Sequence, residues 1–262
     1  MARVQIQQVH KTWGDPEGDH VVALRDVSFE IRHNEFLCLL GPSGSGKSTL
    51  LHIVGALEQQ NGGWIHFDQI SDPSRPRSNL VFQEFALMPW KTVMDNVTLG
   101  LKLRGFPREE REGIGMEYIR MMGLDGFERK YPHQLSGGMK QRVAIARVLV
   151  NDPEVILMDE PFASVDAQTR IFLQQELLKI WEQKRKTVCF VTHSIDEAII
   201  LGDRIVVLTA GPGRVKEIVE EDLPRPRRVE ARTSPEFIKL YDHCWRLIKE
   251  EVERAAATRG AR

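Results

Sequence analysis

A glycine-rich segment lies between an apolar run and a predicted helix near the start of the chain. Its sequence is Gly41-Pro-Ser-Gly-Ser-Gly-Lys-Ser-Thr49, which fits the P-loop pattern G-x-x-x-x-G-K-[ST]. The run Phe36–Leu40 before it is typical of a strand buried on both faces, and Lys47–Ala56 after it has helical character. A strand, a glycine-rich turn and a helix in this order predict an α/β fold.

The residue types in this segment suit a polyphosphate. Glycines let the backbone wrap closely and point its N–H groups inward, and the following helix adds its N-terminal dipole. We expect Lys47 to lie against the β- and γ-phosphates and the Ser48 hydroxyl to ligate Mg²⁺. The predicted nucleotide-binding residues of the segment are Gly41, Pro42, Ser43, Gly44, Ser45, Gly46, Lys47, Ser48 and Thr49.

An acidic pair ends a second apolar run, Val155-Ile-Leu-Met-Asp159-Glu160. Open parallel sheets bind ligands at the carboxyl ends of their strands. Asp159 is therefore expected to hold Mg²⁺, directly or through water, and Glu160 to orient and deprotonate an attacking water. Such a pair is weak evidence by itself, and the P-loop strengthens it.

Composition excludes several other classes. The chain has 36 Lys and Arg against 37 Asp and Glu, a net charge of −1, which argues against a broad nucleic-acid-coating surface. No apolar run approaches the ~18–20 residues that span a bilayer, and no apolar leader suggests export. Cys38, Cys189 and Cys244 show neither metal-site spacing nor a disulfide framework, so buried thiols are expected.

Periodicity predicts an α/β core interrupted by a helical insertion of about 70 residues. Strands are expected at Val4–Val9, Val27–Ile31, Phe36–Leu40, Trp64–Phe67, Asn79–Phe82, Val155–Met158, Val188–Val191, Ile205–Leu208 and Val215–Val219. Helices are expected at Lys47–Ala56, Thr92–Leu103, Arg108–Met122, Gly138–Val150, Ala167–Gln183 and Pro235–Ala257. The last helix follows an extended linker and carries an apolar stripe of Phe237, Leu240, Tyr241, Cys244, Leu247 and Ile248, expected to pack on the core or on a partner.

A further motif separates this chain from other P-loop proteins. The segment Leu135-Ser136-Gly137-Gly138-Met-Lys-Gln141-Arg142 resembles the LSGGxxQR signature of ATP-binding-cassette (ABC) ATPases. Other marks of that family follow in order: Gln83 resembles the Q-loop, Ser164-Val165-Asp166 the D-loop, His193 the switch histidine and Trp13 the aromatic residue that stacks on adenine. The D-loop departs from the commoner Ala-Leu-Asp. The resemblance covers roughly residues 3–220.

The resemblance implies a fold and a set of roles. The fold is a RecA-like P-loop core, about 1–84 and 154–222, with an antiparallel β subdomain and an α-helical subdomain inserted at about 85–153; residues 223–262 form a linker and a C-terminal helix. Glu160, His193, Gln83 and Lys47 are the implied catalytic residues, and Ser48, Gln83 and Asp159 the implied ligands of Mg²⁺. Each ATP is expected to lie between Lys47 of one copy and the signature residues Leu135, Ser136, Gly137, Gly138 and Gln141 of a second copy, with Asp166 in the D-loop.

A finer resemblance is to the ATPases of nitrate, sulfonate, taurine and bicarbonate importers. It rests on Val81–Trp90, Thr92–Val97, Thr192–Ala198, Gly211–Val215 and Leu223–Arg227. In that group the ATPase is a homodimer on the cytoplasmic face of the bacterial inner membrane. It works beneath a membrane permease that an extracytoplasmic solute-binding protein supplies, and it binds no nucleic acid. The apolar segment Phe85–Trp90 is the expected permease-docking surface, with core packing as the alternative.

Two other functions compete with an importer subunit. One is a soluble ABC ATPase of translation, repair or cluster assembly, although only one cassette fits in 262 residues and no long coiled coil is visible. The other is a small-molecule kinase, which has no need of the Leu135–Gly138 motif.

Overall fold

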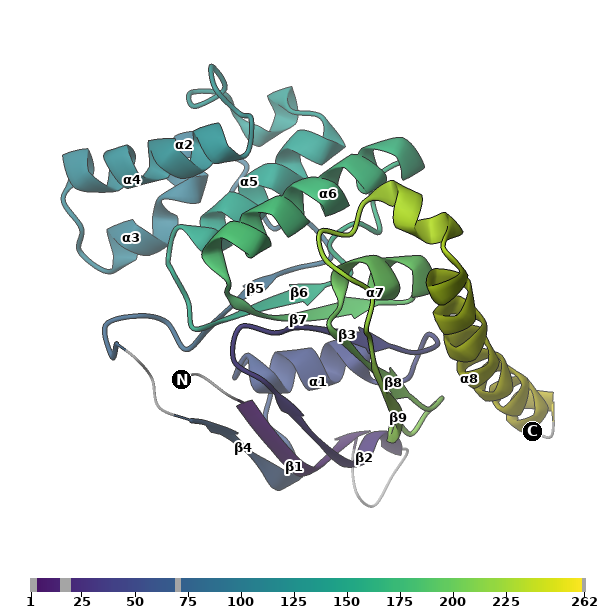
Figure 1. Ribbon diagram of the computed structural model, residues 1–262. Helices are drawn as coiled ribbons and strands as arrows, with labels where there is room; N and C mark the ends of the chain where they lie inside the picture. The colour runs from purple at the N-terminus through teal and green to yellow at the C-terminus, as the bar shows by residue number, and fades with distance from the viewer. Residues whose placement is uncertain (1–3, 15–19, 69–71, 261–262) are drawn as a thin grey trace. The chain divides into compact units, whose positions relative to one another are not determined.

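The computed structural model describes residues 4–14, 20–68 and 72–260 (Figure 1). The chain divides into two compact units, Met1–Ser71 with Arg185–Arg262, and Asp72–Lys184. We call them the P-loop unit and the signature unit after the motifs they carry. Within the described residues, no helix combines the length and apolarity needed to cross a bilayer.

An antiparallel sheet forms one part of the P-loop unit. Its strands lie in the order β2 (His20–Ile31), β1 (Val4–Gly14) and β4 (Gly62–Phe67). Alternate residues of β1, among them Val4 and Ile6, are buried, as expected for a sheet with one face on the core. This sheet is the antiparallel β subdomain that the family resemblance implied.

Parallel strands form the rest of the core of the P-loop unit. β3 (Phe36–Leu40) lies between β7 (Thr187–Thr192) and β8 (Arg204–Leu208) and is parallel to both, while β9 (Val215–Glu220) is antiparallel to β8. All five residues of β3 are buried, as its unbroken apolar sequence predicted. Leu40 at the end of β3 is level with Thr192 at the end of β7. The segments that follow these strands, the P-loop and His193, therefore leave the same edge of the sheet.

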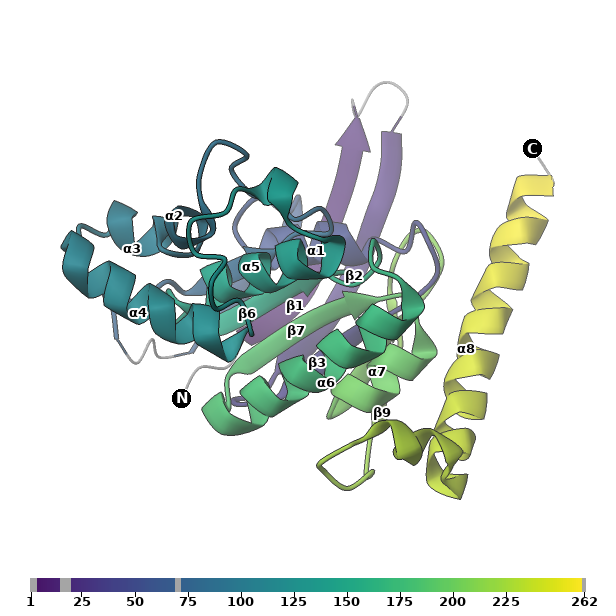
Figure 2. The same cartoon turned by 90° about the horizontal axis from the view of Figure 1, so that it is seen from above.

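Among its described residues, the P-loop unit also has four helical segments: α1 (Lys47–Val54), α7 (Ile195–Leu201), the short 3₁₀ helix η2 (Val229–Thr233) and α8 (Pro235–Gly260). α8 packs on its own unit, since Phe237 and Cys244 of its predicted stripe are buried. Figures 1 and 2 show α8 beside α7, and α8 also contacts β8. All three cysteines are free and buried, as expected.

Helices dominate the signature unit around one short pair of parallel strands, β5 (Ser78–Val81) and β6 (Val155–Asp159). The helices are α2 (Val93–Val97), α3 (Leu99–Leu103), α4 (Arg108–Met121), η1 (Pro132–Gln134), α5 (Gly137–Leu149) and α6 (Ala167–Lys184). The single helix predicted at Thr92–Leu103 is wrong in one respect: it divides at Thr98. The Thr98 side chain donates to the Met94 carbonyl oxygen at 2.8 Å, a local hydrogen bond that competes with regular helix geometry.

Candidate nucleotide-binding site

The P-loop holds the side chain of Lys47 inside its own ring of backbone carbonyl groups. Lys47 is the first residue of α1 and is buried. Its Nζ donates to the Gly41 carbonyl oxygen at 2.8 Å, to the Pro42 carbonyl oxygen at 3.0 Å and to Ser45 Oγ at 3.4 Å. The ammonium group is thus fixed at the N-terminus of a helix, where anions bind.

Two glycines of the loop have conformations that other residues avoid. Gly44 has φ 80° and Gly46 has φ 81°, both in the left-handed region. A Cβ at Gly46 would lie 2.6 Å from Leu24 Cδ2 and 2.8 Å from the Ala23 carbonyl oxygen. The loop backbone therefore curls tightly on β2, as a cradle for phosphate requires.

Trp13, the predicted adenine platform, lies near the end of β1 with 40% of its surface exposed. Lys11 Nζ lies 4.1 Å from the centroid of its ring, a cation–π contact. Residues 15–19 of the neighbouring Gly/Asp-rich stretch fall outside the described residues.

The predicted switch residue His193 is exposed in the turn between β7 and α7. Hydrogen bonds on either side fix this turn. The Ser194 N–H donates to Thr192 Oγ1 at 2.9 Å, and the Glu197 N–H donates to Ser194 Oγ at 3.3 Å, which caps α7.

The acidic pair lies at the end of β6 in the signature unit. Asp159 is buried as the last residue of the strand, and Glu160 follows with φ 41°, a left-handed conformation that non-glycine residues rarely adopt. Strained backbone of this kind clusters at functional sites.

The signature motif forms the start of α5. Ser136 is exposed and caps the helix, accepting a hydrogen bond from the Met139 N–H at 3.3 Å. Nothing lies within 4 Å of a Cβ built at Gly137, whereas one at Gly138 would lie 2.8 Å from Thr169 Cγ2. Gly137 leaves the helix N-terminus open, and Gly138 permits close packing on α6.

A residue of the D-loop caps α6, the helix whose Thr169 lies against Gly138. The Thr169 N–H donates to Asp166 Oδ1 at 3.0 Å and caps α6. This hydrogen bond, more than any other interaction, lowers the pKa of the Asp166 carboxyl. Asp166 is therefore a carboxylate fixed at the N-terminus of α6.

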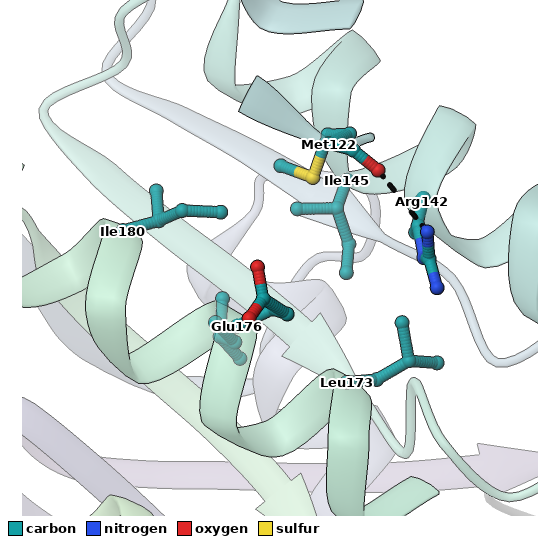
Figure 3. Close-up of a pocket in the computed structure, with 7 residues that line it drawn as sticks. Met122, Arg142, Ile145, Leu173, Glu176 and Ile180 are labelled. Carbon is teal, nitrogen blue, oxygen red and sulfur yellow. Dashed lines mark hydrogen bonds between the residues drawn. The ribbon is translucent and has the colours of Figure 1, made fainter. Parts of the chain in front are cut away.

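Two signature residues lie wholly or partly inside the unit. Gln141 is fully buried, and neither polar atom of its amide has a hydrogen-bond partner among the described residues. Arg142 donates to the Met122 carbonyl oxygen at 3.3 Å beside a small cavity, shown in Figure 3. The cavity has a volume of about 10 Å³, room for no more than a water molecule. It is lined by Met122, Arg142, Ile145, Leu173, Glu176, Leu177 and Ile180.

Gln83 is exposed just after β5, and the segment behind it is anchored by two residues that sequence reasoning missed. Arg147 of α5 donates to the carbonyl oxygens of Ala86 and Phe85 at 2.6 and 3.1 Å. Asn96 of α2 is fully buried and bonds both the N–H and the carbonyl group of Met88. The backbone of Phe85–Met88 is therefore fixed by hydrogen bonds to the unit. Trp90, at the end of the apolar segment, is 71% exposed to solvent.

Each unit carries an oxygen donor of the hard kind that Mg²⁺ prefers: the Ser48 hydroxyl in the P-loop unit and the Asp159 carboxylate in the signature unit. Within the described part of the chain, no group of three or more His, Cys, Asp and Glu side chains is placed to hold a metal ion alone. The P-loop, with its inward ammonium and left-handed glycines, fits the phosphates of ATP.

Comparison with known proteins also indicates an ATP-binding protein of the ABC transporter family. The ABC transporter family model matches residues 24–163. An uncharacterized ABC transporter ATP-binding protein of Methanocaldococcus jannaschii is 55% identical over 90% of this chain and 87% of its own length. An aliphatic sulfonates import ATP-binding protein of Bacillus thuringiensis is 44% identical over 90% of this chain and 92% of its own.

A solved structure supports the fold and the activity. It is a dimeric ATP-binding cassette in a post-hydrolysis state, bound to ADP and Pi. It has a TM-score of 0.73 and 38% sequence identity, and the match covers 83% of this chain and 98% of that one. The motifs, the fold and these relatives agree, so the chain belongs to the ABC transporter family and is one of its ATP-hydrolysing cassettes.

Proposed function

We propose that this chain is the energising subunit of an importer for a small anionic solute, of the nitrate, sulfonate, taurine or bicarbonate type. One observation carries the importer assignment: the Bacillus relative, named for sulfonate import, is 44% identical along nine-tenths of the chain. The P-loop around Lys47 and the second open helix N-terminus, capped by Ser136, carry the ATP-binding part of the proposal.

The proposed chemistry is phosphoryl transfer to water. Bound ATP supplies the transferable γ-phosphoryl group, and Mg²⁺ supplies charge for its oxygens. Lys47 and the P-loop N–H groups bind the β- and γ-phosphates, while Ser48, Asp159 and Gln83 are the proposed ligands of the metal. Glu160 accepts the proton of the attacking water.

Other residues complete the proposed site. His193 donates a hydrogen bond to the γ-phosphate, and Trp13 stacks on adenine through its exposed ring. The open N-terminus at Ser136 and Gly137 is suited to the γ-phosphate of an ATP held by a second copy. Gln141 differs from these residues: its side chain is fully buried, so we propose no direct contact between it and the nucleotide.

Two copies of the chain, each completing the other's site, are the proposed active form, and the dimeric relative is consistent with it. We further propose that the dimer binds a membrane permease at the cytoplasmic face of a cell membrane. Phe85–Trp90 is the proposed contact. An extracytoplasmic solute-binding protein is the proposed source of the solute.

Reconstitution tests this function. The chain would be purified with a candidate permease, placed in phosphatidylethanolamine–phosphatidylglycerol vesicles with the cognate binding protein, and supplied with labelled nitrate, taurine, methanesulfonate or bicarbonate. We expect ATP-dependent accumulation of one of these anions, and its loss with Glu160→Gln. If the ATPase activity is the same with and without the permease, and no solute accumulates, the result would favour a soluble ABC ATPase.

A further inference from the structure

The C-terminal helix α8 lies outside the residues that the family model matches, yet it reaches a loop near the P-loop. Glu251 of α8 is 3% exposed. Its Oε2 accepts a hydrogen bond from the backbone N–H of Ala210 at 3.1 Å. A buried carboxylate on a backbone N–H is a charge-assisted hydrogen bond, among the stronger kinds in proteins.

Ala210 belongs to a tight loop, residues 209–214, that joins β8 to β9. The loop is cross-linked from within by Thr209. The Thr209 N–H donates to the Arg214 carbonyl oxygen at 2.9 Å, and its hydroxyl donates to the Pro212 carbonyl oxygen at 3.0 Å. Because these hydrogen bonds make the loop rigid, the hydrogen bond from Ala210 to Glu251 restrains the position of the whole loop.

The far side of this loop packs on the backbone of the P-loop. A Cβ at Gly213 would lie 2.1 Å from the Ser45 carbonyl oxygen, and one at Gly211 would lie 3.2 Å from the Gly44 carbonyl oxygen. Gly213 also bonds β2, donating to the Ala23 carbonyl oxygen at 2.9 Å. Gly44 and Ser45 are therefore backed by the 209–214 loop.

The charge of Glu251 is compensated where it lies. Lys216 Nζ is 2.9 Å from Glu251 Oε1 and 2.7 Å from Glu250 Oε2, and it also donates to the Leu247 carbonyl oxygen at 2.9 Å. Arg254 Nη1 lies 3.1 Å from Glu251 Oε1. Oε1 of Glu251 thus lies against two cations, while Oε2 accepts the hydrogen bond from the Ala210 N–H.

We propose that α8 braces the P-loop through the 209–214 loop, with Glu251 as the positioning residue. A free P-loop has more conformations than the one that binds phosphate. Fixing its back at Gly44 and Ser45 lowers the entropy lost when a nucleotide binds. Glu251 does not contact the nucleotide; it acts on ATP affinity through Ala210, Gly211 and Gly213.

Variants of α8 separate positioning from general stability. In Glu251→Ala the hydrogen bond to Ala210 is lost, and we expect the Kd for fluorescent mant-ATP and the KM for ATP to rise about three- to tenfold. We expect kcat at saturating ATP to change less than twofold. Glu251→Gln retains an oxygen that can accept from Ala210, and we expect it to restore most of the affinity. Glu250→Ala, which removes an exposed partner of the same lysine, is the matched control and should bind like the wild type.

A second measurement uses the unmodified protein, so it does not depend on any variant folding. Coupling between two sites is reciprocal. Nucleotide binding should therefore slow amide hydrogen exchange in the 209–214 peptide and in α8 around Glu251, besides slowing it in the P-loop. Folded Glu251→Ala with wild-type affinity would overturn the proposal. Protection limited to the P-loop would also overturn it.

Discussion

The side-chain nitrogen of Lys47 lies 2.8 Å from the carbonyl oxygen of Gly41, six residues earlier in the same loop. The lysine that faces the phosphates thus also closes the loop on itself. The loop's shape and its charge depend on one side chain.

Replacing Lys47 by alanine should weaken nucleotide binding strongly while the fold persists. Hydrogen bonds to charged groups contribute roughly 1.5–3 kcal/mol each, so ATP affinity should fall by about a hundredfold. Titration with mant-ATP measures the loss, and circular dichroism checks the fold. Lys102→Ala, at an exposed position of α3, is the control. Normal turnover by folded Lys47→Ala protein would contradict the assignment of the P-loop.

Replacing Glu160 by glutamine should separate binding from hydrolysis. The amide keeps the shape and hydrogen bonding of the side chain at this strained position but cannot accept the proton of water. A general base contributes roughly 10²–10⁴ in rate, so turnover should fall by about that factor. ATP should still bind tightly and should stabilise a dimer on size-exclusion chromatography. Near-normal hydrolysis would mean that another group activates the water.

Replacing Trp90 by aspartate should uncouple the ATPase from its membrane partner. Trp90 is exposed at the tip of a segment that Arg147 and Asn96 hold from behind, so a charge there should not disturb the fold. We expect loss of permease binding and transport with basal ATPase activity retained. Leu103→Asp, at another exposed apolar position of the signature unit, is the control. If Trp90→Asp transports as well as Leu103→Asp and the wild type, Trp90 is not part of the docking surface.

Glu221, just after β9, should give the protein a distinctive pH dependence. Burial raises the pKa of its carboxyl to about 8, although the nearby Arg227 and Arg225 lower it. Between its ordinary pKa of 4.5 and about pH 8, the folded protein keeps a proton that the unfolded chain has released. The free energy of unfolding should therefore fall as pH rises through this range, by at most about 1.4 kcal/mol per pH unit.

Urea titrations of Glu221→Gln across the same range test this dependence. The variant cannot ionise, so its stability should fall less steeply with pH than that of the wild type. Glu220→Gln changes the exposed neighbour, whose pKa is lowered chiefly by a hydrogen bond from Arg32, and should leave the slope between pH 5 and 8 unchanged. Identical slopes for wild type and Glu221→Gln would show that Glu221 is ionised in the folded state.

The elements that sequence predicted well are those with local signals. β3 is an unbroken apolar run, and the P-loop and signature motif have fixed spacings on single segments. α7 was not predicted as a helix: it has only seven residues, nearly all of them buried, so no polar face marks its period. Its one signal was the cap, Ser194 followed three residues later by Glu197.

The contacts that sequence reasoning missed join residues far apart in the chain. Arg147 and Ala86 are 61 positions apart, and Glu251 and Ala210 are 41 apart. An arginine in α5 or a glutamate in α8 has the local pattern of a solvated helix residue. Only the folded chain shows that each is directed at a backbone group that supports the site.

The proposal that each ATP site is completed by a second copy is tested most directly by mixing two inactive variants. Lys47→Ala lacks the phosphate-binding charge, and Ser136→Arg blocks the open start of α5. In a mixed dimer one site carries both lesions, while the other joins an intact P-loop to an intact signature motif. We predict that an equimolar mixture regains ATPase activity that neither variant has alone, and that wild-type specific activity rises with protein concentration. Specific activity that does not change with dilution, in protein shown to be monomeric, would contradict the account.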